Sequence, residues 1–129
     1  MTVMSIAEAW PTAGRPFTVQ DLDRMPDDGH RYEVLDGALI VSPRPVIAHQ
    51  EVAMELAVQL RQACPRELRV IPEPAVEVSA STEFIPDIVV IRRDQVRAAK
   101  CTEAPLLVVE VRSPSTALNT SEHRSTRSG

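Results

Sequence analysis

The chain has 129 residues, of which 43% are hydrophobic and 25% are charged, as in one ordinary globular domain. A formal net charge of −4 argues against a protein that binds nucleic acid through a general positive field, although it leaves local recognition open. The sequence shows neither an apolar stretch near the roughly 18 residues of a membrane helix nor a signal-like N-terminus, so we expect a cytoplasmic protein. Cys64 and Cys101 have neither metal-site spacing nor disulfide density, and we expect both to be reduced.

The first third of the chain predicts a loose start, a short helix and a hairpin. Residues 1–16 carry several Pro and Gly residues and are expected to be loose. Thr18 followed by Asp21 resembles a capping box, which predicts a short helix that ends before the next proline. Two strand-forming runs within 31–41 flank Asp36-Gly37. This dipeptide predicts a tight hairpin, because both turn positions favour positive φ.

The middle of the chain predicts one long helix and a pair of strands. In segment 47–63 apolar residues recur at helical spacing and predict a stripe that faces the core, formed by Val52, Leu56, Leu60 and Ala63. The runs 68–71 and 75–78 predict two strands that pair with each other. A polar stretch at 94–104 has room for one helical turn or two.

The most informative feature is a pair of apolar runs that each carry one acidic residue. The runs are 84–91, which contains Asp87, and 106–112, which contains Glu110. Short Val, Ile and Leu runs are typical of strands buried on both faces, where an unpaired carboxylate is costly. Two such carboxylates predict a shared partner, and a hard divalent cation is the simplest one. The alternative is a surface position for the first acid and an arginine ion pair for the second.

Four short motifs then follow one another in a specific order. They are Arg31-Tyr-Glu33-Val-Leu-Asp36-Gly37, His49-Gln50, Pro86-Asp87-Ile-Val-Val and Val108-Val-Glu110-Val-Arg-Ser-Pro-Ser-Thr116. Together they resemble the Uma-two family of predicted restriction endonucleases, a branch of the PD-(D/E)XK nuclease superfamily. The resemblance covers residues 17–116. It implies an α/β (α+β) domain with a restriction-endonuclease-like core, in which a mixed sheet is flanked by helices.

The resemblance also implies a magnesium or manganese site on adjacent strands, for hydrolysis of phosphodiester bonds in DNA. Asp87 and Glu110 fall on its metal-ligand positions, and Glu33 is a possible third ligand, with a solvent-facing strand position equally open. The superfamily's catalytic lysine position holds Arg112, which keeps the positive charge but stays protonated. For His49, hydrogen bonding at the helix start is favoured over contact with a phosphate or a carboxylate.

The chain departs from the family pattern at its C-terminus. The resemblance implies a further helix with a lysine and a tyrosine, and a closing strand with a Tyr-Trp pair. Asn119 and His123 have the spacing of the helix motif but not its chemistry, and the only lysine is Lys100. We expect residues 117–129 to be disordered or frame-shifted, and the last helix and strand of the fold to be missing.

Two functional interpretations follow from this departure. One is a divalent-metal-dependent endonuclease that hydrolyses DNA, whose activity is either lost or retained after truncation. The alternative is a degenerate, non-catalytic fragment of the nuclease fold that binds nucleic acid or a protein partner. In either case a missing strand leaves an unpaired sheet edge, which invites a homodimer.

Overall fold

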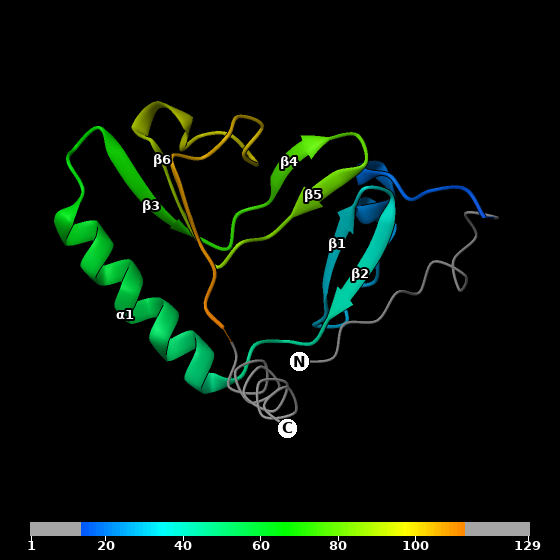
Figure 1. Cartoon of the computed structure of the whole chain (residues 1–129), viewed down its shortest axis with the longest axis horizontal. Helices are drawn as coiled ribbons and strands as arrows, with labels where there is room; N and C mark the ends of the chain where they lie inside the picture. The colour runs from blue at the N-terminus through cyan, green and yellow to red at the C-terminus, as the bar shows by residue number, and fades with distance from the viewer. Residues whose placement is uncertain (1–13, 113–129) are drawn as a thin grey trace, which may run out of the picture.

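The computed structural model describes residues 14–112, which form two antiparallel sheets, one α-helix and two short 3-10 helices (Figure 1). The elements are η2 (Val19–Arg24), β1 (Arg31–Leu35), β2 (Ala38–Ser42), α1 (Ile47–Ala63), β3 (Leu68–Pro72), β4 (Val76–Ser79), β5 (Thr82–Phe84), β6 (Ile88–Arg92), η3 (Arg93–Gln95) and β7 (Leu107–Val109). The predicted α+β fold class is therefore confirmed. The expected mixed sheet is not found among the described residues, because every strand pair there is antiparallel. The tail expected to be disordered, 117–129, lies outside the described residues, as do residues 1–13 of the expected loose start.

The first sheet has the strand order β2-β1-β5-β4 and is built on the predicted hairpin. β1 and β2 pair along their whole length, and the turn residues Asp36 and Gly37 have φ values of 48° and 82°. These angles are why the Asp-Gly dipeptide closes the hairpin. The predicted short helix is present as the 3-10 helix η2. Its Leu22 packs against a small core formed by Phe17, Val34 and Leu39, so that η2 covers the hairpin.

The second sheet has the strand order β3-β6-β7, and α1 covers one of its faces. Leu56 and Leu60 of the helix pack against a core formed by Val70, Ile88 and Val90. The alternate residues of β6 face the other way and pack with Val76 of β4. β6 is therefore buried on both faces, as its uninterrupted apolar sequence predicts.

Three expectations about these elements are wrong. β3 pairs with β6 instead of β4, because β4 leaves for the first sheet and pairs with β5. The second acidic run is not buried on both faces, since β7 has three half-exposed residues and is an edge strand within residues 14–112. Within the predicted helix stripe, Val52 is 49% exposed, and the helix turns Leu56, Ala57 and Leu60 toward the sheet.

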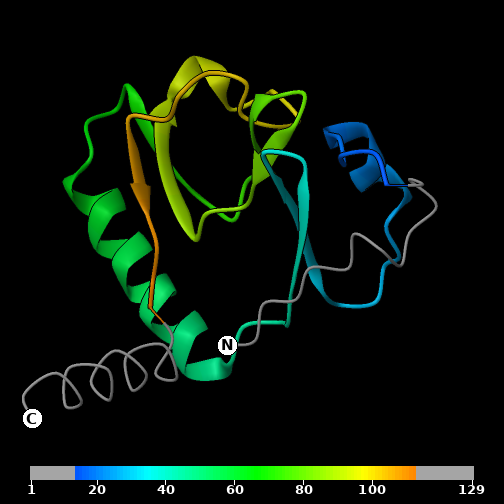
Figure 2. The same ribbon diagram turned by 45° about the vertical axis from the view of Figure 1, so that its right-hand side comes forward.

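The two sheets meet beside the link between β5 and β6. In both views α1 lies with the β3-β6-β7 sheet, while η2 lies at the opposite end of the molecule (Figures 1 and 2). The chain passes between the sheets at residues 43–46, 73–75 and 85–87. The last two passages touch, because the Glu73 N–H donates to the backbone oxygen of Asp87 at 3.0 Å. Among residues 14–112, no helix is long and apolar enough to cross a membrane.

Candidate active site

Asp87 and Glu110 lie opposite each other at the ends of β6 and β7. In this antiparallel pair Ile88 stands opposite Val109, and the two acids are the next residues outward on each strand. Asp87 is only 3% exposed, whereas Glu110 follows the edge strand and reaches solvent. The structure therefore brings together the two acids that the sequence singled out.

The buried carboxylate of Asp87 is contacted by one backbone N–H and two basic side chains from three parts of the chain. Its Oδ2 accepts a hydrogen bond from the Val111 N–H at 2.6 Å and lies 3.3 Å from Nε2 of His49. Its Oδ1 lies 3.9 Å from Nη1 of Arg31. These contacts compensate the cost of burying the charge and fix the orientation of the carboxylate.

Glu110 has a perturbed acidity because its carboxyl is partly buried and lies close to other acids. Burial of its carboxyl, repulsion by Asp87, a hydrogen bond to Asp87 and repulsion by Glu33 together raise the pKa of Glu110 to about 7, while Arg31 opposes this shift. Two carboxyls in contact cannot both ionise at little cost, so the pair favours either a shared proton or a cation. This is the electrostatic signature of many functional sites.

Glu33 is the third acid of the neighbourhood, and it projects from β1 in the other sheet. Its Oε2 accepts a hydrogen bond from the Ile85 N–H at 2.7 Å, and the residue is half-buried. Glu33 is thus no simple solvent-facing strand residue. Its charge acts on Glu110, but one of its two oxygens is already engaged with the backbone.

The arrangement of these acids suits a cation that keeps some of its water ligands. Among the described residues, no group of three or more His, Cys, Asp or Glu side chains is placed so that it could hold a metal ion. The acids thus do not form a closed cage of protein ligands. The contacting carboxyls of Asp87 and Glu110 do fit Mg²⁺, which keeps several waters and takes one or two carboxylates plus substrate phosphate.

The remaining predicted residues and their neighbours complete the site. Arg112 lies two residues beyond Glu110, at the exposed end of the described chain. His49 contacts the carboxylate of Asp87, so the interpretation that the sequence disfavoured is the one observed, and its Nδ1 is buried without a partner among the described residues. The sequence alone predicts no role for Arg31. Its position two residues before Glu33, on the same face of a strand, was the available signal.

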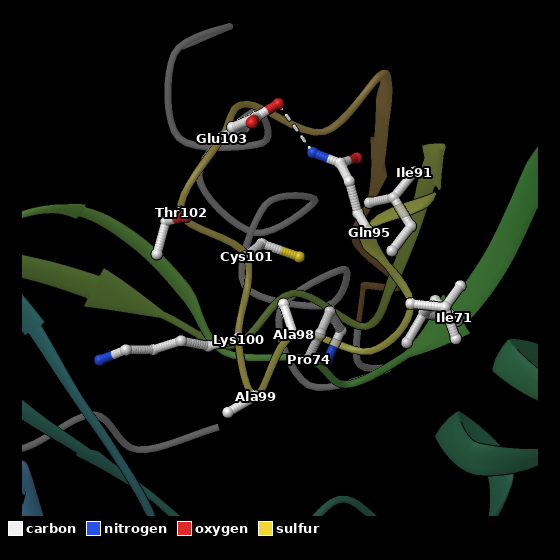
Figure 3. A pocket seen from close by; sticks show the side chains of 11 residues that line it. Ile71, Pro74, Ile91, Gln95, Ala98, Ala99, Lys100, Cys101, Thr102 and Glu103 are labelled. Atoms are coloured by element: carbon white, nitrogen blue, oxygen red, sulfur yellow. Dashed lines mark hydrogen bonds between the residues drawn. The ribbon is translucent and has the colours of Figure 1, made fainter. Parts of the chain in front are cut away.

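A separate hollow lies on the far side of the second sheet and does not belong to this site. It has a volume of about 320 Å³ and is lined by the segment 95–103 together with Ile71, Pro74 and Ile91 (Figure 3). Lys100 points away from the hollow, and its Nζ bonds Glu83 at 2.9 Å and Glu77 at 3.1 Å. The single lysine of the chain is therefore engaged with carboxylates other than those of the candidate site.

Comparison with known proteins identifies the kind of fold that carries this site. The sequence profile of the Uma2 family, described as "Putative restriction endonuclease", matches residues 19–126. A crystal structure described as "a putative nuclease belonging to DUF820 from Anabaena variabilis ATCC 29413" superposes with a TM-score of 0.63 at 20% identity. The match covers 84% of this chain and 67% of that chain. No curated protein matches the sequence.

Proposed function

We propose, from the premise that the chain belongs to the Uma2 family, that it is an endonuclease that hydrolyses phosphodiester bonds in DNA with a divalent cation. The observation that supports this most is the contact between the carboxyls of Asp87 and Glu110, where burial of Glu110 together with repulsion by Asp87 raises the pKa of Glu110 to about 7. Two crowded carboxyls at one edge of the sheet are a favourable place for a hard cation such as Mg²⁺ or Mn²⁺.

In this proposal Asp87 and Glu110 hold the cation, and Glu33 adds a third negative charge from β1. Oε2 of Glu33 is bonded to Ile85, so only its other oxygen is offered to the cation or to a bound water. When bound, such a cation polarises the phosphate and makes a coordinated water more acidic. The hydrogen bond from the Val111 N–H keeps the Asp87 carboxylate in place before substrate arrives.

Arg112 is the proposed partner for the negative charge that develops on the phosphate. A guanidinium grips phosphate oxygens in a bidentate way, but it stays protonated and so transfers no proton. The proton steps would therefore have to pass through water or a carboxylate. We extend the proposal to a cytoplasmic location, in keeping with the free thiols of Cys64 and Cys101.

The test is Mn²⁺ binding by calorimetry together with cleavage of duplex DNA. We expect Asp87→Asn and Glu110→Gln each to abolish both, whereas Glu103→Gln, which neutralises an exposed acid paired with Arg92, leaves both unchanged. Binding without cleavage in the wild-type chain would favour the non-catalytic alternative. Absence of Mn²⁺ binding in the wild type would refute the proposed metal site.

A further inference from the structure

Arg31 lies at the centre of the contacts that join the two sheets beside the candidate site. Its Nη1 donates to the carbonyl oxygen of Ile85 at 3.2 Å, and its Nη2 donates to Oε1 of Glu73 at 3.0 Å. The same Nη1 lies 3.9 Å from Oδ1 of Asp87. The planar fork of one guanidinium thus spans three segments: β1, the β3–β4 connection and the β5–β6 link.

Two side chains of β1 bind the backbone of the β5–β6 link, one at the N–H and one at the C=O of Ile85. Glu33 accepts the N–H of Ile85, and Arg31 donates to the C=O of the same residue. Arg31 and Glu33 are two positions apart on β1 and so share one face of the strand. Ile85 lies two residues before Asp87, so these two side chains fix the backbone that leads into Asp87.

Glu73, in the β3–β4 connection, contacts both Arg31 and the backbone of Asp87. It is a non-glycine residue with a φ of 50°, a backbone conformation that L-residues seldom adopt. Its N–H donates to the backbone oxygen of Asp87, and its carboxylate binds Arg31. Arg31 therefore supports an unusual backbone conformation that is bonded directly to Asp87.

We infer that Arg31 is a positioning residue for Asp87: by holding the Ile85 carbonyl and the Glu73 carboxylate, it keeps Asp87 in the orientation that meets Glu110. The cation-binding part of this inference rests on the proposed function. A positive charge near the acids by itself weakens cation binding, whereas correct positioning of a ligand strengthens it. The two roles therefore predict opposite effects when the charge is removed.

The first measurement is Mn²⁺ affinity by calorimetry for folded Arg31→Gln and Arg31→Lys variants, with folding checked by circular dichroism. We expect both to bind about tenfold more weakly or worse, because loss of a supporting contact typically has this effect on a metal site. Lysine keeps the charge but cannot span three segments with a fork. Arg69→Gln is the control, since its guanidinium donates to carbonyls of its own neighbourhood, Arg66 and Leu68. Unchanged or tighter binding in Arg31→Gln overturns the inference.

A second measurement needs no metal. The Val111 amide donates to Asp87 at 2.6 Å, so its proton resonance in the presence of a chelator reports the position of that carboxylate. We expect this resonance to move in both Arg31 variants and to stay in place in the Arg69 control. An unmoved resonance in Arg31→Lys overturns the positioning role. If the wild type binds no Mn²⁺, the proposed function fails, and the Val111 resonance still decides the role of Arg31.

Discussion

Burial of the Glu110 carboxyl and repulsion by its neighbouring acids make the stability of the metal-free protein depend on pH. The pKa of Glu110 is about 7 in the folded chain against an ordinary value of 4.5, so the folded state binds this proton more tightly than the unfolded state does. Stability from this group is therefore fully present below pH 4.5 and is lost as the pH rises through about 7.

The size of the effect follows from the same two values. The gap between 4.5 and about 7 corresponds to at most about 3.4 kcal/mol of unfolding free energy. Glu110 is partly exposed to water, which screens the repulsion, so we expect a loss of about 1 to 2 kcal/mol. Substitution of Glu110 by Gln removes the titrating group and with it this part of the pH dependence.

The assay is urea unfolding with a chelator at about pH 5 and about pH 8, for the wild type and for Glu110→Gln. The informative quantity is the difference between the two pH profiles, because the contributions of groups that both proteins share cancel in it. We expect the wild type to lose about 1 to 2 kcal/mol more than the variant. Parallel profiles, or a wild type that gains stability relative to Glu110→Gln as the pH rises, would refute the raised pKa of Glu110.

Three further predictions concern the hairpin, a surface hydrogen bond and the open sheet edge. Gly37→Ala should lower the free energy of unfolding in urea by about 2 to 3 kcal/mol, because φ is +82° and the new Cβ would lie 2.8 Å from the Cβ of Pro16. Gly14→Ala has a similar φ but no atom within 4 Å of the new Cβ, and should lower it by about 1 kcal/mol. Equal costs would contradict the clash. Tyr32, the only tyrosine, should ionise with a pKa of about 12, because its hydroxyl donates to Asp28 at 2.5 Å, and tyrosinate absorbance should show the pKa falling toward 10 in Asp28→Asn. The wild type should form a homodimer in light-scattering measurements and Val108→Lys a monomer, because a charge on the exposed edge strand blocks pairing; a monomeric wild type would contradict this.

Features with local causes were predictable from the sequence. The hairpin follows from the turn requirements of Asp36-Gly37, and the helix at 47–63 follows from its apolar spacing. The pairing of Asp87 with Glu110 was also within reach, since each acid interrupts the end of an apolar run and neighbouring strands align such ends. For these three features the sequence pattern alone predicts the observed arrangement.

Features that depend on distant partners were not predictable in this way. Consecutive strands often pair, but β3 prefers β6, because the apolar faces of these two strands share one core under α1. The apolar sequence of β7 does not distinguish an edge strand from a central one. Arg31 bonds residues 42 and 54 positions away, so its spacing from Glu33 indicates a shared strand face but does not reveal these partners.

The two acids of the site stand on strands of very different local stability. β6 is buried on both faces, whereas β7 is a three-residue edge strand with Leu107 and Val108 more than 40% exposed. We expect the edge strand to separate from the sheet far more often than β6 opens. Asp87 then keeps its position, while Glu110 is next to it only when β7 is paired with β6. The apparent affinity for a cation is then the intrinsic one reduced by the fraction of molecules with β7 docked. Any strand that pairs with the outer edge of β7 would raise that fraction, and would tighten cation binding without touching the cation.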